Sequence, residues 1–307
     1  MLVPEGEQQI RGRVRLITWR TGTALAVVLF IAGCGTSSQE NATAPTPSKT
    51  AASATDAPAA TDEPAAGEAP DDGEMTAAYE AATTPEAQNG RQIMEQAELL
   101  EGLAATVNET FNLPNDVRLL GQQCGDPNAF WDPSEQAVVL CYEDADFAET
   151  VFAADGDPDP VDAALNAEIG SFYHELGHML VDLYDLPITG REEDVADQLA
   201  AFVLLAENED GSIDPESVKA VRDFAGEFRA FAEQEGEVGE SQFAGGHSLN
   251  QTRMYNLLCW AYGADPDANA SIVGDGELPQ DRAELCEDEY AKIEYGWATL
   301  LEPYVKD

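Results

Sequence analysis

The chain has 307 residues, and its 59 acidic and 15 basic side chains give a formal net charge of −44 at pH 7. Nucleic acids and anionic lipid surfaces bind basic patches, so this charge argues against nucleic acid as a partner and against electrostatic docking on a membrane. Hydrophobic residues make up 44% of the chain, the usual share for a protein with a folded core. We interpret the acid excess as a source of solubility.

The first 33 residues have the composition of an export signal. Four arginines precede an apolar run at 24–31, which is too short for a transmembrane helix of about 20 residues. The run ends in Leu-Phe-Ile-Ala-Gly-Cys34, and small residues directly before a cysteine resemble the lipobox of bacterial lipoproteins. That resemblance implies cleavage after residue 33 and a lipid on Cys34, which would anchor the protein to a bacterial membrane, in the cell envelope and outside the cytoplasm. The alternative is an ordinary signal peptide with an incidental cysteine.

Residues 34–84 are expected to form a flexible acidic tether. Between 35 and 74 the chain has no Leu, Ile, Val, Met, Phe, Tyr or Trp, and it is mostly Ala, Thr, Ser, Pro, Asp and Glu. Such a segment buries too little apolar surface to offset the entropy lost on ordering. We therefore expect residues 85–307 to form the folded domain.

The first part of that domain is predicted to contain one long helix and a small sheet. Apolar residues at helical spacing predict a helix over 86–112, and 117–122 has the pattern of a short strand. Two apolar runs at 129–131 and 137–142 flank a turn sequence, which predicts a hairpin.

The remainder is predicted to be helical. Asp159 followed by Pro160 is typical of an N-cap and the first position of a helix, here one that extends to about residue 184. Ser248-Leu-Asn-Gln251 has the pattern of a capping box and is expected to open a helix to about residue 262. Other helices are expected over 191–207, 215–234 and most of 280–304. The expected fold class is helix-rich α+β with a small sheet near its start.

Four cysteines remain besides Cys34. An even number in an exported chain favours disulfides, and three pairings of four cysteines are possible. We favour the local pairing, Cys124–Cys141 and Cys259–Cys286. A cysteine metal site is the alternative, but no two of these residues have the C-x₂-C spacing that such sites use.

The segment His174-Glu-Leu-Gly-His178 has the H-E-x-x-H pattern on an expected helix. Residues at i and i+4 share one face of a helix, so both imidazoles can reach one Zn²⁺ ion. Glu175 is then in place to act as general base toward the water on that metal. Gly177 leaves room for a neighbouring backbone. The alternative is a chance pattern on a solvated helix face.

A catalytic zinc needs a third protein ligand, and the next expected helix supplies acidic candidates. Glu193 and Asp197 share one face of that helix. Glu193 can take the metal while Asp197 accepts a hydrogen bond from a ligand histidine and fixes its tautomer. Glu192 and Asp194 are competing ligands, and a solvated acidic surface is the other interpretation.

Together these motifs resemble the gluzincins, the zincin metallopeptidases whose third ligand is a glutamate on a second helix that carries E-x-x-x-D. More narrowly, the chain from about Cys124 onward resembles a bacterial family described only as metallopeptidases. The resembling pieces are Cys124-Gly125, Asn128 to Trp131, Cys141 to Glu143, HELGH, Glu192 to Asp197, His247 and Cys259 to Gly263. The resemblance implies a zincin-like fold and one Zn²⁺ per chain, and it gives no substrate.

The same resemblance implies a role for each residue of the motifs. His174, His178 and Glu193 would be the zinc ligands, Glu175 the general base, and Asp197 the partner of a ligand histidine. The chain differs from the family in having few residues between His178 and Glu193. The turn-like segment 186–190 must therefore bring the second helix back antiparallel to the first.

His247, the remaining histidine, is the candidate for stabilising the oxyanion, since gluzincins often use a later His or Tyr for this. The alternative is a loop histidine with structural hydrogen bonds. Arg253 and Tyr255 are weaker candidates.

The sequence therefore favours a zinc-dependent endopeptidase acting on proteins or peptides outside the cytoplasmic membrane. One alternative is an inactive relative of the same fold that serves as a binding or scaffold lipoprotein. Another is a zinc amidase with a non-protein substrate, because the same water activation would serve it. The intact set of His174, Glu175, His178 and Glu193 favours an enzyme.

Overall fold

A computed structural model of the protein describes residues 69–208 and 210–306. The expected export signal at 1–33, Cys34 and most of the expected tether lie outside these residues. Within the described ranges, no helix is both long and apolar enough to cross a membrane.

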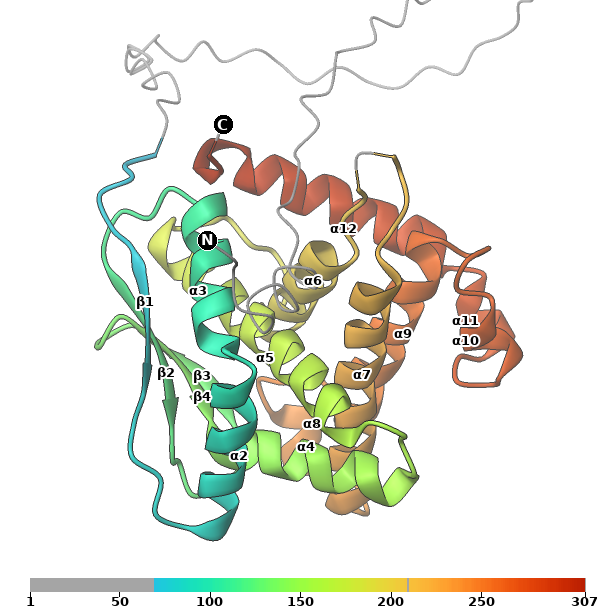
Figure 1. Ribbon diagram of the computed structural model, residues 1–307. Coiled ribbons are helices and arrows are strands. Elements are labelled where there is room, and N and C mark those ends of the chain that lie inside the picture. The colour runs from blue at the N-terminus through green and yellow to red at the C-terminus, as the bar shows by residue number, and fades with distance from the viewer. Residues whose placement is uncertain (1–68, 209, 307) are drawn as a thin grey trace, which may run out of the picture. The chain divides into compact units, whose positions relative to one another are not determined.

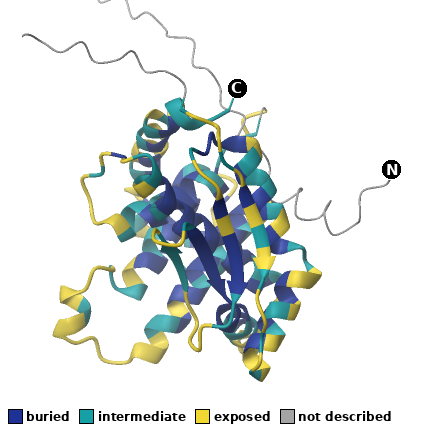
Figure 2. Ribbon diagram, turned by 90° about the vertical axis from the view of Figure 1, so that its left-hand side faces the viewer, coloured by how far each residue is buried: buried dark blue, intermediate teal, exposed yellow. Residues whose placement is uncertain are grey.

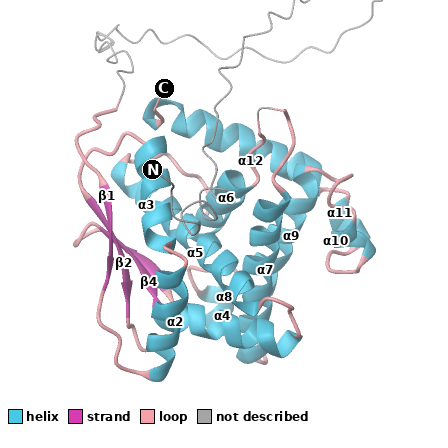
Figure 3. Ribbon diagram, viewed as in Figure 1, coloured by secondary structure: helices cyan, strands magenta, loops and turns pink. Residues whose placement is uncertain are grey.

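One four-stranded sheet forms one side of the structure (Figures 1 and 3). Its strands are β1 (Met75–Tyr79), β2 (Val117–Gln122), β3 (Ala129–Asp132) and β4 (Ala137–Cys141), in the order β1-β2-β4-β3. β1, β2 and β4 are parallel, and β3 runs antiparallel at one edge. Every residue of β4 is buried, as its unbroken apolar sequence requires, and the centre of the sheet is dark blue in Figure 2.

Helices pack against this sheet and make up most of the domain (Figure 3). Their bounds are α2 (Pro85–Gln96), α3 (Leu99–Thr110), α4 (Tyr142–Asp155), α5 (Pro160–Leu183), α6 (Glu192–Leu204), α7 (Pro215–Glu235), α8 (Glu240–Ala244), α9 (Asn250–Ala264), α10 (Ser271–Gly274), α11 (Gln280–Ala283), α12 (Cys286–Leu301) and a 3₁₀ turn at Glu302–Tyr304. The helix-rich α+β class and the 129–142 hairpin agree with the sequence.

The long helix α5 lies at the centre of the domain. It packs against β3 and β4 and also against α4, α6 and α7. Local residues determine where α5 begins. The side chain of Asp159 caps the helix by accepting a hydrogen bond from the backbone N–H of Asp162, and Pro160 occupies the first helical position. Most of its residues are buried, so the residues that α5 carries are held in fixed positions.

Both expected disulfides are present. Cys124 and Cys141, with Cα atoms 5.5 Å apart, join the loop after β2 to the end of β4. Cys259 and Cys286, with Cα atoms 5.1 Å apart, join α9 to the start of α12. The first bridge holds the loop that leads into β3, and the second holds α9 against the C-terminal helix.

The expected continuous helix over 86–112 is two helices, α2 and α3. The chain breaks between them at Glu98, whose φ of 51° lies in the left-handed region. The Tyr79 hydroxyl fills the break, since it donates to the carbonyl of Met94 and accepts from the N–H of Leu100, both at 3.2 Å. Apolar spacing could not predict this break, because the buried positions continue in phase across it.

The folded part also begins earlier than residue 85. Residues 75–79, which were expected to belong to the tether, form β1 and pair in register with β2. The side chain of Asn108 fixes the start of this strand by hydrogen bonds to the N–H and C=O of Met75. The sequence feature that indicates β1 is the return of apolar residues at Met75.

Two further details differ from the sequence prediction. The helix after His247 starts at Asn250 with Leu249 as its N-cap and no side-chain cap, so the predicted capping box at Ser248 was wrong. The helix α4, between β4 and α5, was not predicted.

We expect Tyr79→Phe to lower the free energy of unfolding by about 1–3 kcal/mol, because it leaves the carbonyl of Met94 and the N–H of Leu100 without their hydroxyl partner. Denaturant unfolding measures this change. Tyr295→Phe is the matched control, because Tyr295 is 76% exposed. Equal stability of the two variants would contradict the role given to Tyr79.

Candidate metal centre

The close packing of α5 and α6 positions the candidate site. A Cβ atom on Gly177 would lie 2.9 Å from the Cα of Ala196, closer than real Cβ contacts allow. Only glycine therefore lets the two helices approach this closely at that point. The approach places the face of α6 that carries Glu193 and Asp197 directly against the histidines of α5.

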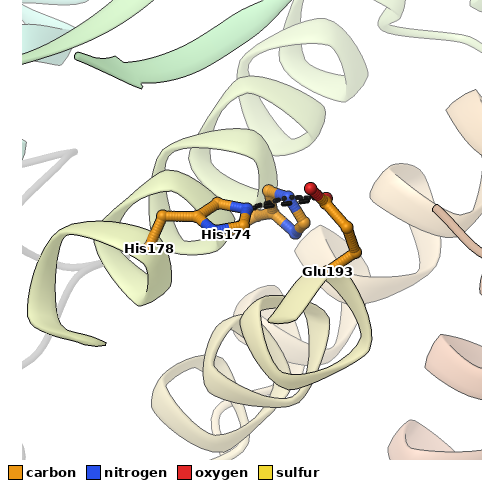
Figure 4. A group of neighbouring side chains, drawn as sticks. All are labelled: His174, His178 and Glu193. Carbon is orange, nitrogen blue, oxygen red and sulfur yellow. Dashed lines mark hydrogen bonds and ion pairs between the residues drawn. The ribbon is translucent and has the colours of Figure 1, made fainter. Parts of the chain in front are cut away.

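His174, His178 and Glu193 converge on one point (Figure 4). The two Nε2 atoms of the histidines lie 3.2 Å apart. Oε2 of Glu193 lies 3.4 Å from the His174 Nε2 and 3.5 Å from the His178 Nε2. Each of these three atoms therefore faces the other two.

The partners of the two Nδ1 atoms indicate which atoms face the centre. His174 Nδ1 lies 2.8 Å from Oδ1 of Asp197, and His178 Nδ1 lies 2.8 Å from Oε1 of Glu192. A carboxylate only accepts, so each Nδ1 carries a proton, and a metal ion at the centre would take the Nε2 lone pair of each ring. Two Nε2 atoms and a carboxylate oxygen that face one another form a site that a cation can occupy.

These distances fit a metal ion. Ligands about 2.0–2.1 Å from a tetrahedral zinc ion lie roughly 3.3 Å from one another, close to the separations seen here. Glu193 Oε2 is buried, and within the described part of the chain its polar neighbours are the Nε2 atoms of His174, His178 and His247. A metal ion would bind this oxygen together with the first two nitrogen atoms. His174, His178 and Glu193 are thus the residues that could hold it.

Asp197 is fixed from its other side by Arg253 of α9. Arg253 donates from Nε to Oδ2 at 2.8 Å and from a terminal nitrogen to Oδ1 at 2.6 Å, and its guanidinium lies 3.8 Å from the centroid of the Phe228 ring. Burial raises the pKa of Asp197, but the charge and hydrogen bonds of Arg253 outweigh it and lower the pKa to about 2. Asp197 is therefore ionised at neutral pH, next to the Nδ1 atom of His174.

Glu175 lies beside this centre and is 6% exposed. Its Oε1 lies 3.9 Å from His174 Nε2, and its Oε2 accepts a hydrogen bond of 2.8 Å from the backbone N–H of Trp131 in β3. Burial raises the pKa of Glu175, although the neighbouring His174 and His178 and the Trp131 N–H lower it in part. A carboxylate with a raised pKa is a better proton acceptor at neutral pH.

His247 is brought to the same centre, with its Nε2 2.9 Å from Oε2 of Glu193. Its side chain is 63% exposed. In this arrangement it pairs with the candidate ligand, and its role toward an oxyanion stays a prediction. Of the weaker candidates, Arg253 is engaged by Asp197, and Tyr255 does not line the cleft.

The competing acidic residues of α6 lie in different places. Glu192 holds the outer nitrogen of His178, a role that the sequence analysis did not assign to it. Asp194 faces away and lines a separate hollow with residues of α9 and α12. The sequence also did not predict the two hydrogen bonds from Arg253 to Asp197. The sequence feature that could have indicated them is that Arg253 is the one charged residue of α9.

An open cleft of about 570 Å³ runs over the centre. It is lined by residues of β3 and by the candidate ligands His174, His178 and Glu193, together with Glu175 and His247. β3 is an edge strand, bonded to β4 on one side. The cleft therefore brings a strand edge, a cluster able to hold a metal and a buried carboxylate together.

Comparison with known families gives one match. The family described as "Putative metallopeptidase" matches residues 79–301. The chain belongs to this family. No curated protein and no solved structure matches the chain significantly. The matched region begins within β1 and contains the whole candidate centre, so membership and geometry both point to a metal-dependent peptidase.

Loss of the Asp197 carboxylate should weaken metal binding without removing a ligand. We expect Asp197→Asn to raise the Kd for Zn²⁺ about 10–100-fold, because the amide no longer fixes the tautomer of His174. Competition with a chromophoric chelator measures the Kd. Asp194→Asn, a change in the same helix at a residue that lines a separate hollow, should leave the Kd unchanged. Equal Kd values for Zn²⁺ in Asp197→Asn and Asp194→Asn would refute the role given to Asp197.

Proposed function

We propose that the protein is a zinc-dependent metallopeptidase of the zincin type, with His174, His178 and Glu193 as ligands of one zinc ion. The observation that carries the proposal is the convergence of two Nε2 atoms and one carboxylate oxygen at mutual distances of 3.2–3.5 Å. Three nitrogen and oxygen ligands that leave a fourth position open are typical of catalytic zinc. Family membership supports the same reaction class.

The side chains around the centre have distinct roles in this proposal. When bound, a zinc ion supplies the Lewis acidity that activates water and polarises a carbonyl. Glu175 accepts the proton from water and later passes it to the leaving amine. The Trp131 N–H holds Oε2 of Glu175 and so orients the carboxylate. His247, at the rim, is the candidate to donate a hydrogen bond to the developing oxyanion.

The edge strand supports a peptide as substrate. β3 forms a wall of the cleft, and its side away from β4 pairs with no other strand in the described residues. An extended peptide can add to such an edge through backbone hydrogen bonds, with alternate side chains pointing into the cleft. This feature favours peptide hydrolysis over action on a non-protein amide. The intact Glu175 favours an enzyme over an inactive scaffold.

The proposed location rests on the sequence. The arginine-rich start, the short apolar run and the small residues before Cys34 favour a lipid anchor outside the cytoplasmic membrane of a bacterium. The two disulfides support an oxidising compartment.

Removal of the general base tests the mechanism. Glu175→Gln should bind zinc as the unchanged protein does and should lower kcat for peptide hydrolysis about 10²–10⁴-fold, because the amide accepts no proton. Zinc content and release of fragments from an unstructured protein substrate measure the two effects. Glu287→Gln, an exposed residue of α12, is the control and should keep full activity. Unaltered hydrolysis in Glu175→Gln would refute the role of Glu175.

A further inference from the structure

A second, smaller chamber of about 120 Å³ lies beside the candidate centre. It is bordered by His174 and Glu175 of α5 and reaches between α4, α5 and α7. Asn128, Ala129 and His247 line both this chamber and the open cleft. Its size is close to that of an engineered cavity of about 150 Å³ that binds benzene, so it can hold one side chain.

The chamber is acidic and deeply buried. Glu227 of α7 and Asp144 of α4 both line it and are 2% and 4% exposed. Glu168 of α5 is 1% exposed and close enough to both to interact electrostatically with them. Oε1 of Glu227 and both carboxyl oxygens of Glu168 have no hydrogen-bond partner within the described part of the chain. Buried carboxyl groups without partners are costly, and a cation would relieve that cost.

The nearby cation of the chain is already engaged. Arg253 also lines the chamber, but its guanidinium donates to both oxygens of Asp197 and lies over the Phe228 ring. The acidic groups that line the chamber are therefore Asp144, Glu175 and Glu227, and His174 and His247 line it on the side of the candidate centre. The charge of Arg253 is balanced by Asp197. The chamber keeps an acidic excess.

An organic cation fits this chamber better than a metal ion does. Within the described ranges, His174, His178 and Glu193 are the one group of three possible ligands whose atoms all lie within 4.8 Å of one another. Asp144, Glu168 and Glu227 are therefore too widely spaced to hold an ion together. The rings of Phe224, Phe228 and Phe231 line the same space, and aromatic rings suit an alkyl stem and a cationic head group.

We propose that this chamber binds the lysine or arginine side chain of a substrate residue next to the bond that is cut, with Glu227 and Asp144 as its partners. The inference rests on the proposed peptidase function and adds a substrate class to it. Burial raises the pKa of Asp144 to about 7 and raises that of Glu227 as well. A bound cation would lower both pKa values again, because its charge stabilises the ionised form of the two carboxylates.

Cleavage of a mixed peptide library by the zinc-loaded full chain tests the proposal, with fragments identified by mass spectrometry. We expect lysine and arginine to be enriched at one of the two positions that flank the cut. In the best peptide, replacement of that lysine by norleucine should lower kcat/KM about tenfold or more, because the chain of carbons is kept and only the charged partner is lost.

Variants of Glu227 in α7 and of Asp144 in α4 connect the preference to the chamber. Glu227→Gln should lower the lysine-to-norleucine ratio of kcat/KM several-fold, and Asp144→Asn should do the same if Glu227→Gln does not fold. Glu233→Gln, at an exposed position of α7, should keep the original ratio. An unchanged ratio in Glu227→Gln and Asp144→Asn, or hydrolysis without preference for a basic residue, would overturn the chamber assignment and leave the peptidase proposal intact.

A binding measurement separates failure of the two proposals. If the zinc-loaded chain hydrolyses no peptide, the Kd values of the lysine and norleucine peptides are measured by calorimetry on the full chain in chelator. Tighter binding of the lysine peptide, weakened by Glu227→Gln, would support the chamber while the peptidase proposal fails. Equal Kd values would overturn the chamber proposal.

Discussion

The contact between Gly177 and Ala196 is the constraint on which the candidate centre depends. A side chain at 177 would push α5 and α6 apart, because even a Cβ atom there would lie 2.9 Å from the Cα of Ala196. The histidines belong to one helix and Glu193 to the other, so the ligand distances of 3.2–3.5 Å exist only while the helices touch. The short segment between the helices and the burial of α5 keep them in this position, so the fold fixes the site before any metal binds.

Around the three candidate ligands lies a layer of charges that determines their protonation. Asp197 and Glu192 hold the outer nitrogens of the two histidines, and Arg253 keeps Asp197 ionised. Arg253 also connects α9 to the centre and lines the acidic chamber beside it. The disulfide from Cys259 to Cys286 holds the same helix against α12. The disulfide from Cys124 to Cys141 and the Trp131 N–H act on the other side, where they hold β3 next to Glu175. The C-terminal helices and the small sheet thus both serve the geometry of one cleft.

Local patterns predicted most of the helices, the hairpin, both disulfides and the three residues that converge. The helices and the histidine pair depend on patterns within a few residues, such as i and i+4 for His174 and His178, or a cap followed by proline. The errors arose where distant residues decide the structure. Tyr79 ends one helix and starts the next through its hydroxyl, and β1 forms only because β2 pairs with it. In the same way, Arg253 and the chamber carboxyls Asp144 and Glu227 come from three different helices, and no single-segment pattern could bring them together.

The central claim is that His174, His178 and Glu193 bind one metal ion. Elemental analysis of the purified full chain, prepared without chelator, measures it most directly, with His174→Ala as the matched variant. Residues 75–84 must be kept in the protein measured, because β1 belongs to the sheet. We expect about one zinc per chain in the unchanged protein and none in the variant. No bound metal in the unchanged protein, or equal content in both, would contradict it.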